Sequence, residues 1–216
     1  MRYNTVMNTS INKSNKPKLT KKGQETRTRI IVAAAELMYE QGVAGTTIED
    51  VQQKAKVSAS QLYHYFKEKK ELVMAVISYQ SSRIIGNHSR YLTDLDSFEA
   101  LYAWRNFIVD IQIKKNCEGG CPLGALASEL VETDTEARSE INSSFLEWED
   151  SIRNGLRFML NREELNSNAD PDKLALALLT ALQGGLLLTQ VRRDPGPIIT
   201  ALDTMLEHIK SFSKDK

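Results

Sequence analysis

The sequence has few of the residues that cross-link a chain or interrupt its regular structure. Among 216 residues there are 2 cysteines, 5 prolines and 11 glycines. Two cysteines cannot form the disulfide framework that stabilises small secreted domains. The low proline and glycine content excludes collagen-like and low-complexity classes. Hydrophobic residues make up 41% and charged residues 26% of the chain, which is typical of a globular protein with a core of its own.

Long hydrophobic runs are also missing, and the first residues do not predict a signal peptide. The longest apolar stretch, around residues 174–188, contains Thr180 and Gln183 and is shorter than the roughly 20 residues that span a bilayer. Residues 1–18 contain no apolar segment of the signal-peptide kind. We therefore expect a soluble, cytoplasmic protein that does not contact a membrane.

The net charge is zero, but the charge is unevenly distributed. Residues 1–72 contain 13 Lys or Arg against 7 Asp or Glu, whereas residues 73–216 contain 15 against 21. A basic N-terminal third favours contact of that end with a polyanion such as nucleic acid. A solvated basic tail would produce the same asymmetry.

Hydrophobic periodicity predicts an all-α fold. Residues 1–22 are polar and are expected to form a flexible basic arm. From Gln24 onward apolar residues recur at helical spacing, and no segment alternates like a strand. About nine helices are expected, at 24–42, 48–55, 59–66, 68–90, 97–115, 123–131, 135–161, 171–192 and 197–213.

Two short helices carry capping signals at their starts. Thr47 is followed three residues later by Asp50, and Ser58 by Gln61, so both starts read as capping boxes. Helices joined by a turn at residues 56–58 indicate a helix-turn-helix. A plain helical hairpin with an exposed tyrosine and histidine fits the same pattern.

The second of these helices has the residue types of a DNA-reading helix. Small residues at its start let the backbone approach base edges in a major groove, while hydroxyl and aromatic tips reach phosphates or thymine methyl groups. The residues expected to face outward are Ala59, Ser60, Tyr63 and His64.

Lys69 and Lys70 fall in the first turn of the next helix. Cations there oppose the helix macrodipole. A bound phosphate would offset that cost. A screened surface charge is the alternative. Thr47, at another helix start, suits a second phosphate.

Residues 27–72 resemble the DNA-binding domain of the TetR family of bacterial transcriptional repressors. Lys56 departs from the family pattern, which usually has glycine there, and this hints at a binding protein that has lost DNA recognition. The residues that match are Gly42, Thr46, Thr47, Ile48, Val51, Val57, Ser58, Leu62, Tyr63, Tyr65, Phe66 and Lys69.

The resemblance implies a helix-turn-helix domain at 23–70 and a ligand-binding and dimerisation domain at 71–216. It implies a homodimeric, non-enzymatic repressor that binds a palindromic operator and is released by a small-molecule inducer, with no cofactor. The fourth helix would transmit the signal, and the last two helices would pair with their copies in the second chain. Bases would be contacted by Ala59, Ser60 and Tyr63, and phosphates by Thr47, Ser58, His64, Tyr65 and Lys69.

The C-terminal part contains a second recognisable segment, Gly120-Cys121-Pro122-Leu123-Gly124, which is similar to the GCPLG segment of one branch of the family. Cys117 and Cys121 could sense oxidants or electrophiles, or serve a thiol-dependent enzyme, although a cysteine before proline is most often a packing residue. The cysteine and histidine spacing does not fit a metal site. The expected inducer pocket consists of Trp104, Phe107, Cys121, Phe145, Trp148 and Gln183.

Overall fold

A computed structural model describes residues 19–92 and 95–214, and within them the regular structure is helical apart from one isolated bridge between Leu165 and Ser213. The prediction of an all-α chain is confirmed. The predicted arm falls mainly outside the described residues, and Lys21 and Lys22 already belong to the first helix. The helices are α1 (Lys21–Gly45), α2 (Ile48–Ala55), α3 (Ala59–Tyr65), α4 (Lys69–Leu92), α5 (Phe98–Lys114), α6 (Pro122–Leu130), α7 (Thr135–Asn161), α8 (Pro171–Arg192) and α9 (Gly196–Lys210).

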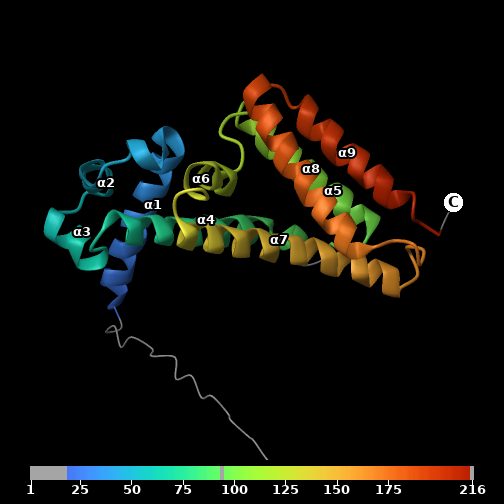
Figure 1. The fold of residues 1–216 in the computed structure, drawn as a ribbon, viewed down its shortest axis with the longest axis horizontal. Coiled ribbons are helices and arrows are strands. Elements are labelled where there is room, and N and C mark those ends of the chain that lie inside the picture. The colour runs from blue at the N-terminus through green and yellow to red at the C-terminus, as the bar shows by residue number, and fades with distance from the viewer. Residues whose placement is uncertain (1–18, 93–94, 215–216) are drawn as a thin grey trace, which may run out of the picture.

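The helices form two groups joined by two long helices. Helices α1 to α3 gather at one end, which we call the head, and α5, α8 and α9 gather at the other end, which we call the body (Figure 1). Helices α4 and α7 pack against each other and run between the two ends. Helix α6 contacts α1, α4 and α7 where the head meets the body.

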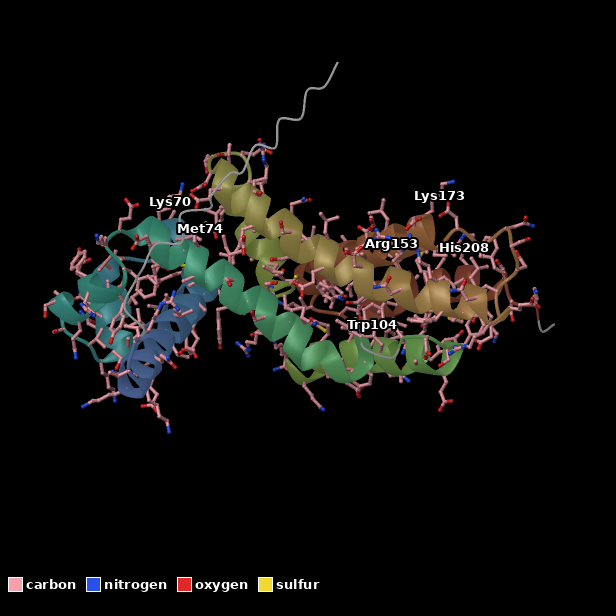
Figure 2. The ribbon with its side chains drawn as sticks, turned by 90° about the horizontal axis from the view of Figure 1, so that it is seen from below. Lys70, Met74, Trp104, Arg153, Lys173 and His208 are labelled. Carbon is pink, nitrogen blue, oxygen red and sulfur yellow. The ribbon has the colours of Figure 1, made fainter. Side chains whose placement is uncertain are left out.

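Each end has its own hydrophobic core. The head core contains residues of α1 to α3 together with the first turns of α4, such as Leu72 and Val76, and Leu126 of α6. The body core is built by α5, α7, α8 and α9 and contains Trp104, which is fully buried (Figure 2). The expected domain boundary at residues 70 and 71 lies at the start of α4, whose first turns complete the head core.

Glycine and proline stand at several helix ends. Gly42 has a φ of 80° and interrupts α1, after which one more turn extends to Gly45. Pro122 and Pro171 stand in the first turns of α6 and α8, where a missing N–H is tolerated. The C-terminal helix is shorter than expected and ends at Lys210 rather than 213.

Helix α8 carries apolar residues on both its buried and its exposed face, which the sequence pattern did not separate. By length and composition it is apolar enough to cross a membrane, contrary to the expectation from the interrupted stretch, but it packs against α7 and α9 and contributes one face to the body core. On its other face Leu176, Leu187, Leu188 and Val191 are exposed. Val191, near the end of the helix, is 71% exposed, whereas Leu174 near its start is buried.

Candidate DNA-binding interface

Two reciprocal capping boxes fix the starts of α2 and α3. The Thr47 amide donates to Asp50 Oδ2 at 3.0 Å, and the Asp50 amide donates to Thr47 Oγ1 at 3.1 Å. Hydrogen bonds from Thr47 lower the pKa of Asp50. At α3 the Ser58 amide donates to Gln61 Oε1 at 3.0 Å, and the Gln61 amide donates to Ser58 Oγ at 3.2 Å. Both predicted capping boxes are confirmed.

The turn between these helices is made by a residue in the left-handed region. Lys56 has φ 52° and ψ 53°, and its amide donates to the carbonyls of Gln52 and Gln53 at the end of α2. Glycine adopts this conformation without a steric penalty, whereas a side chain makes it unfavourable. The exposed Lys56 therefore closes the turn at an energetic cost to the head.

Helix α3 is anchored on one side and open on the other. Leu62 and Phe66 are 0% and 2% exposed and hold the helix against the head core. The opposite face is exposed, as the sequence predicted, and presents Ala59, Ser60, Tyr63 and His64. The Tyr63 side chain is 50% exposed. This arrangement leaves a row of short and aromatic side chains on a rigid helix, which can enter a major groove.

The remaining predicted phosphate contacts have partners inside the chain. The hydroxyls of Thr47 and Ser58 accept capping hydrogen bonds at the exposed starts of α2 and α3. Tyr65 is partly buried, and its ring meets that of His64 edge to face at a centroid distance of 5.0 Å. Their contacts with DNA stay predictions.

The two lysines at the start of α4 are turned toward other elements. Lys69 Nζ donates to the Val43 carbonyl at 2.6 Å, near the end of α1. Lys70 lies beside the start of α7, where its ammonium pairs with Asp134 at 3.3 Å and Glu136 at 3.0 Å (Figure 2). These carboxylates raise the pKa of Lys70. The cations thus have protein partners, so their position does not by itself require a bound phosphate.

Comparison with known families accounts for both ends of the chain. Residues 30–76 match the family model described as bacterial regulatory proteins of the tetR family, and residues 98–205 match the tetracyclin repressor-like C-terminal domain. The chain belongs to the TetR family. Its members are DNA-binding transcriptional regulators rather than enzymes, which sets aside a thiol-dependent enzyme.

Relatives of this TetR-family chain are described as HTH-type transcriptional regulators. An uncharacterized HTH-type transcriptional regulator in the lacX 3' region of Lactococcus lactis is 28% identical over 200 residues, which covers 88% of this chain and 95% of the relative. The HTH-type transcriptional regulator TtgR of Pseudomonas putida is 25% identical over 168 residues, covering 74% of this chain and 78% of TtgR.

Solved structures show the same fold. A TetR transcriptional regulator from Chloroflexus aurantiacus superposes with a TM-score of 0.77 at 24% identity, covering 90% of this chain and 98% of the other. The reduced form of NemR from E. coli gives a TM-score of 0.73 at 19% identity, covering 89% and 100% of the two chains.

A second candidate site of this TetR-family chain is a cavity at the junction of head and body. Two residues of the expected inducer pocket, Cys121 and Trp148, line this cavity. Gln183, the third, does not line the cavity, and its side chain lowers the pKa of the Cys121 thiol. The other three expected residues, Trp104, Phe107 and Phe145, belong to the body core or pack against it and do not line the cavity.

The aromatic residues of the sequence do not predict the polar lining of the cavity. Gln80 and Gln112 are each 5% exposed and face the cavity, as does Tyr39 of α1. Gln112 continues the buried stripe formed by Trp104 and Ile108 at spacings of four. The sequence did contain a signal for this lining, because a polar residue stands at a position where the helical period requires an apolar one.

The two free cysteines lie in different environments. Cys117 is buried in the loop before α6, and its carbonyl accepts a hydrogen bond from Arg193. Burial raises the pKa of the Cys121 thiol, although Gln183 and backbone amides act in the opposite direction. A raised pKa lowers the thiolate fraction that reacts with oxidants and electrophiles. Among the described residues no group of His, Cys, Asp and Glu could hold a metal ion.

Proposed function

We propose that this protein is a cytoplasmic repressor that binds a palindromic operator as a homodimer and releases it when a small molecule binds in the body. The observation that carries the proposal is the exposed face of α3, held rigid by Ser58 and Gln61 at its start and by buried Leu62 and Phe66 behind it. Rigid placement allows a short helix to select a base sequence.

We assign base contacts to the start and middle of α3. Ala59 and Ser60 allow close approach to the groove floor, and Tyr63 reaches further along the same exposed face. We assign phosphate contacts to the residues around this face, namely Thr47, Ser58, His64, Tyr65 and Lys69. The Lys69 ammonium retains donors beyond the one that Val43 accepts.

The exposed apolar face of α8 supports a dimer. Leu176, Leu187 and Val191 are 54%, 59% and 71% exposed, and Gly184 between them has open space where a Cβ would stand. A strip of exposed large apolar side chains on one helix is typical of a protein interface. Pairing of α8 and α9 with their copies would bury it in a four-helix bundle.

Sequence-specific DNA binding is the property that tests this function. The purified protein is used to select DNA from a random pool, and its affinity for the selected sequence and for scrambled DNA is measured by fluorescence anisotropy over a salt series. We expect a palindromic consensus and far tighter binding to it, since specific sites are commonly bound about 10³-fold or more tighter than random DNA. Equal affinities for the two would contradict the proposal.

Two variants separate the assigned roles in that assay. Tyr63→Ala should weaken binding to the selected sequence by about 1–3 kcal/mol and reduce base preference at one position. Lys69→Ala should weaken binding to all sequences and lower the slope of the salt dependence by about one phosphate. Lys70→Ala is the matched control, because its ammonium is held by Asp134 and Glu136. If the DNA affinity of Lys69→Ala depends on salt concentration as steeply as that of wild type, Lys69 does not contact a phosphate.

A thiol-based sensor is the second candidate. Cys121 lines the cavity, so a reagent bound there would lie next to this residue. The raised pKa of this thiol makes a packing role the better interpretation.

A further inference from the structure

The cavity lies between the part of the molecule that would bind DNA and the part that would bind a ligand. It has a volume of about 490 Å³, within the range of pockets that hold drug-sized molecules. Helices α4, α5 and α8 line it, Cys121 and Pro122 at the start of α6 border it, and Ala35, Glu36 and Tyr39 of α1 close it on the head side. A bound molecule would therefore touch a helix of the head directly.

One part of the cavity wall is apolar. Ile108 and Ile111 of α5, Leu186 of α8, Ile84 of α4 and Trp148 of α7 provide it. An apolar skeleton gains free energy when it leaves water for such a surface, and an indole ring additionally favours an aromatic partner. The apolar wall thus favours a ligand with an aromatic skeleton.

Another part of the wall carries buried polar groups that lack partners. Gln112 is 5% exposed, and its Oε1 has no hydrogen-bond partner within the described part of the chain. The Tyr39 hydroxyl is likewise buried without a partner there, and burial raises the pKa of this phenol. Buried polar groups in folded proteins are nearly always hydrogen-bonded. The Gln112 Oε1 itself has almost no accessible surface, so a ligand that donates to it requires the side-chain amide to turn toward the cavity that Gln112 lines. The new hydrogen bond would then satisfy an otherwise unfavourable acceptor.

The charged groups at the cavity disfavour a cationic ligand. Arg83 and Lys115 border it, and Lys115 Nζ lies 5.9 Å from the centroid of the Tyr39 ring. Glu36 is the one carboxylate of the lining, against these two cations, and it shares Lys54 with Glu40, at 3.2 Å and 3.5 Å. The cavity lining is therefore positive on balance, which favours neutral and anionic molecules.

We propose that this cavity binds an uncharged or anionic aromatic molecule with a hydroxyl group that donates a hydrogen bond to Gln112. The site assignment depends only on the cavity, whereas its role as the inducer site rests on the proposed function. Hydroxyl groups both donate and accept, so a second one can bond the Tyr39 phenol or Gln80, which is also buried and lines the cavity.

Gln112→Leu tests the hydrogen bond with little change in volume. Because the substitution removes a buried amide that has an unpaired oxygen, the ligand-free protein should fold and melt at the same or a higher temperature than wild type. The matched control is Asn106→Leu on the same helix, where the side chain is exposed and lies outside the cavity.

The probes are three molecules with one skeleton: 4-phenylphenol, biphenyl and the ammonium ion of 4-(aminomethyl)biphenyl. Their affinities are measured by calorimetry and by the tryptophan emission of the protein, since Trp148 lines the cavity. We expect 4-phenylphenol to bind wild type and Asn106→Leu equally, and Gln112→Leu about tenfold more weakly. Biphenyl should bind wild type and Gln112→Leu with the same affinity, and the ammonium probe should bind wild type more weakly than 4-phenylphenol.

Two results would overturn the proposal: equal affinity of 4-phenylphenol for wild type and Gln112→Leu, or tighter binding of the ammonium probe than of 4-phenylphenol. Operator binding without any probe is measured separately. If the protein binds no operator but 4-phenylphenol binding depends on Gln112, the repressor function fails and the ligand site stands. If operator binding is specific but 4-phenylphenol binding does not depend on Gln112, the ligand site fails and the repressor function stands.

Discussion

At the scale of single residues, the turn of the helix-turn-helix shows how one side chain affects the stability of a tight turn. Lys56 occupies the left-handed region at the end of α2, where it closes the chain toward Ser58. Its side chain is exposed, so no packing compensates for the backbone conformation. The head therefore folds with lysine in this position because the caps and the buried residues of α2 and α3 determine the turn around it.

Replacing this lysine should separate backbone strain from charge. Lys56→Gly is expected to stabilise the protein by up to about 1 kcal/mol, because relief of the left-handed strain exceeds the entropy that glycine adds to the unfolded chain. Lys56→Ala removes the same charge and keeps the strain, so it should not gain stability. Thermal melting of the three proteins is the measurement. An alanine variant as stable as the glycine variant would show that strain is not the cause.

At the scale of elements, α6 joins the cavity to the head. Its first residue, Pro122, borders the cavity, while Glu129 in its last turn accepts hydrogen bonds from the amides of Val43 at 2.8 Å and Ala44 at 3.4 Å. These amides begin the turn that follows the interruption of α1 at Gly42. If a ligand shifts α6, the turn at Val43 and Ala44 should therefore move as well. Lys69 of α4 contacts the same turn, because its ammonium donates to the Val43 carbonyl.

Removing the carboxylate should uncouple the two sites. Glu129→Ala is expected to leave probe affinity and cavity shape unchanged and to reduce the effect of a bound ligand on operator affinity by about tenfold, the scale of one charged hydrogen bond. The matched control is Glu132→Ala in the exposed loop after α6. Operator affinity with and without saturating ligand is measured for each protein. A Glu129→Ala protein that responds like wild type would exclude this route.

At the scale of the whole molecule, the distribution of apolar surface decides how two chains can meet. Helix α8 exposes large apolar residues along one face, whereas its other face belongs to the body core. Leu186 lies in that core and Leu187 beside it is 59% exposed, so neighbouring leucines have opposite environments. The dimer interface must therefore be tested at the exposed positions, because a charge at Leu186 would damage the fold itself.

Leu187→Glu should dissociate the proposed dimer. A glutamate there would be buried without a partner in the interface, which typically costs several kcal/mol, while in the monomer it would remain in water. Phe158→Glu on α7 is the matched control, since Phe158 is also 59% exposed. Sedimentation at micromolar concentration should give a 24.4 kDa monomer for Leu187→Glu and a dimer for wild type and Phe158→Glu. A wild-type protein that sediments as a monomer would contradict the dimer.

The sequence by itself determined the local structure. Helical periodicity, the capping pairs begun by Thr47 and Ser58, and the breaks at proline and Gly42 predicted nearly every helix, because caps and turns depend on residues only a few positions apart. The exposed face of α3 followed from the same short-range pattern, since Leu62 and Phe66 lie four residues apart. These parts of the candidate DNA interface needed no tertiary information.

Only the tertiary structure decided which residues meet across elements. Tyr39 of α1 and Gln112 of α5 line the same cavity, and a cavity is what remains when helices distant in sequence pack together. Trp104 was expected in the pocket but packs into the body core, because helical spacing gives the face of a residue and not the neighbour that covers it. For the same reason periodicity could not separate the buried from the exposed leucines of α8, whose apolar residues occupy both faces of the helix.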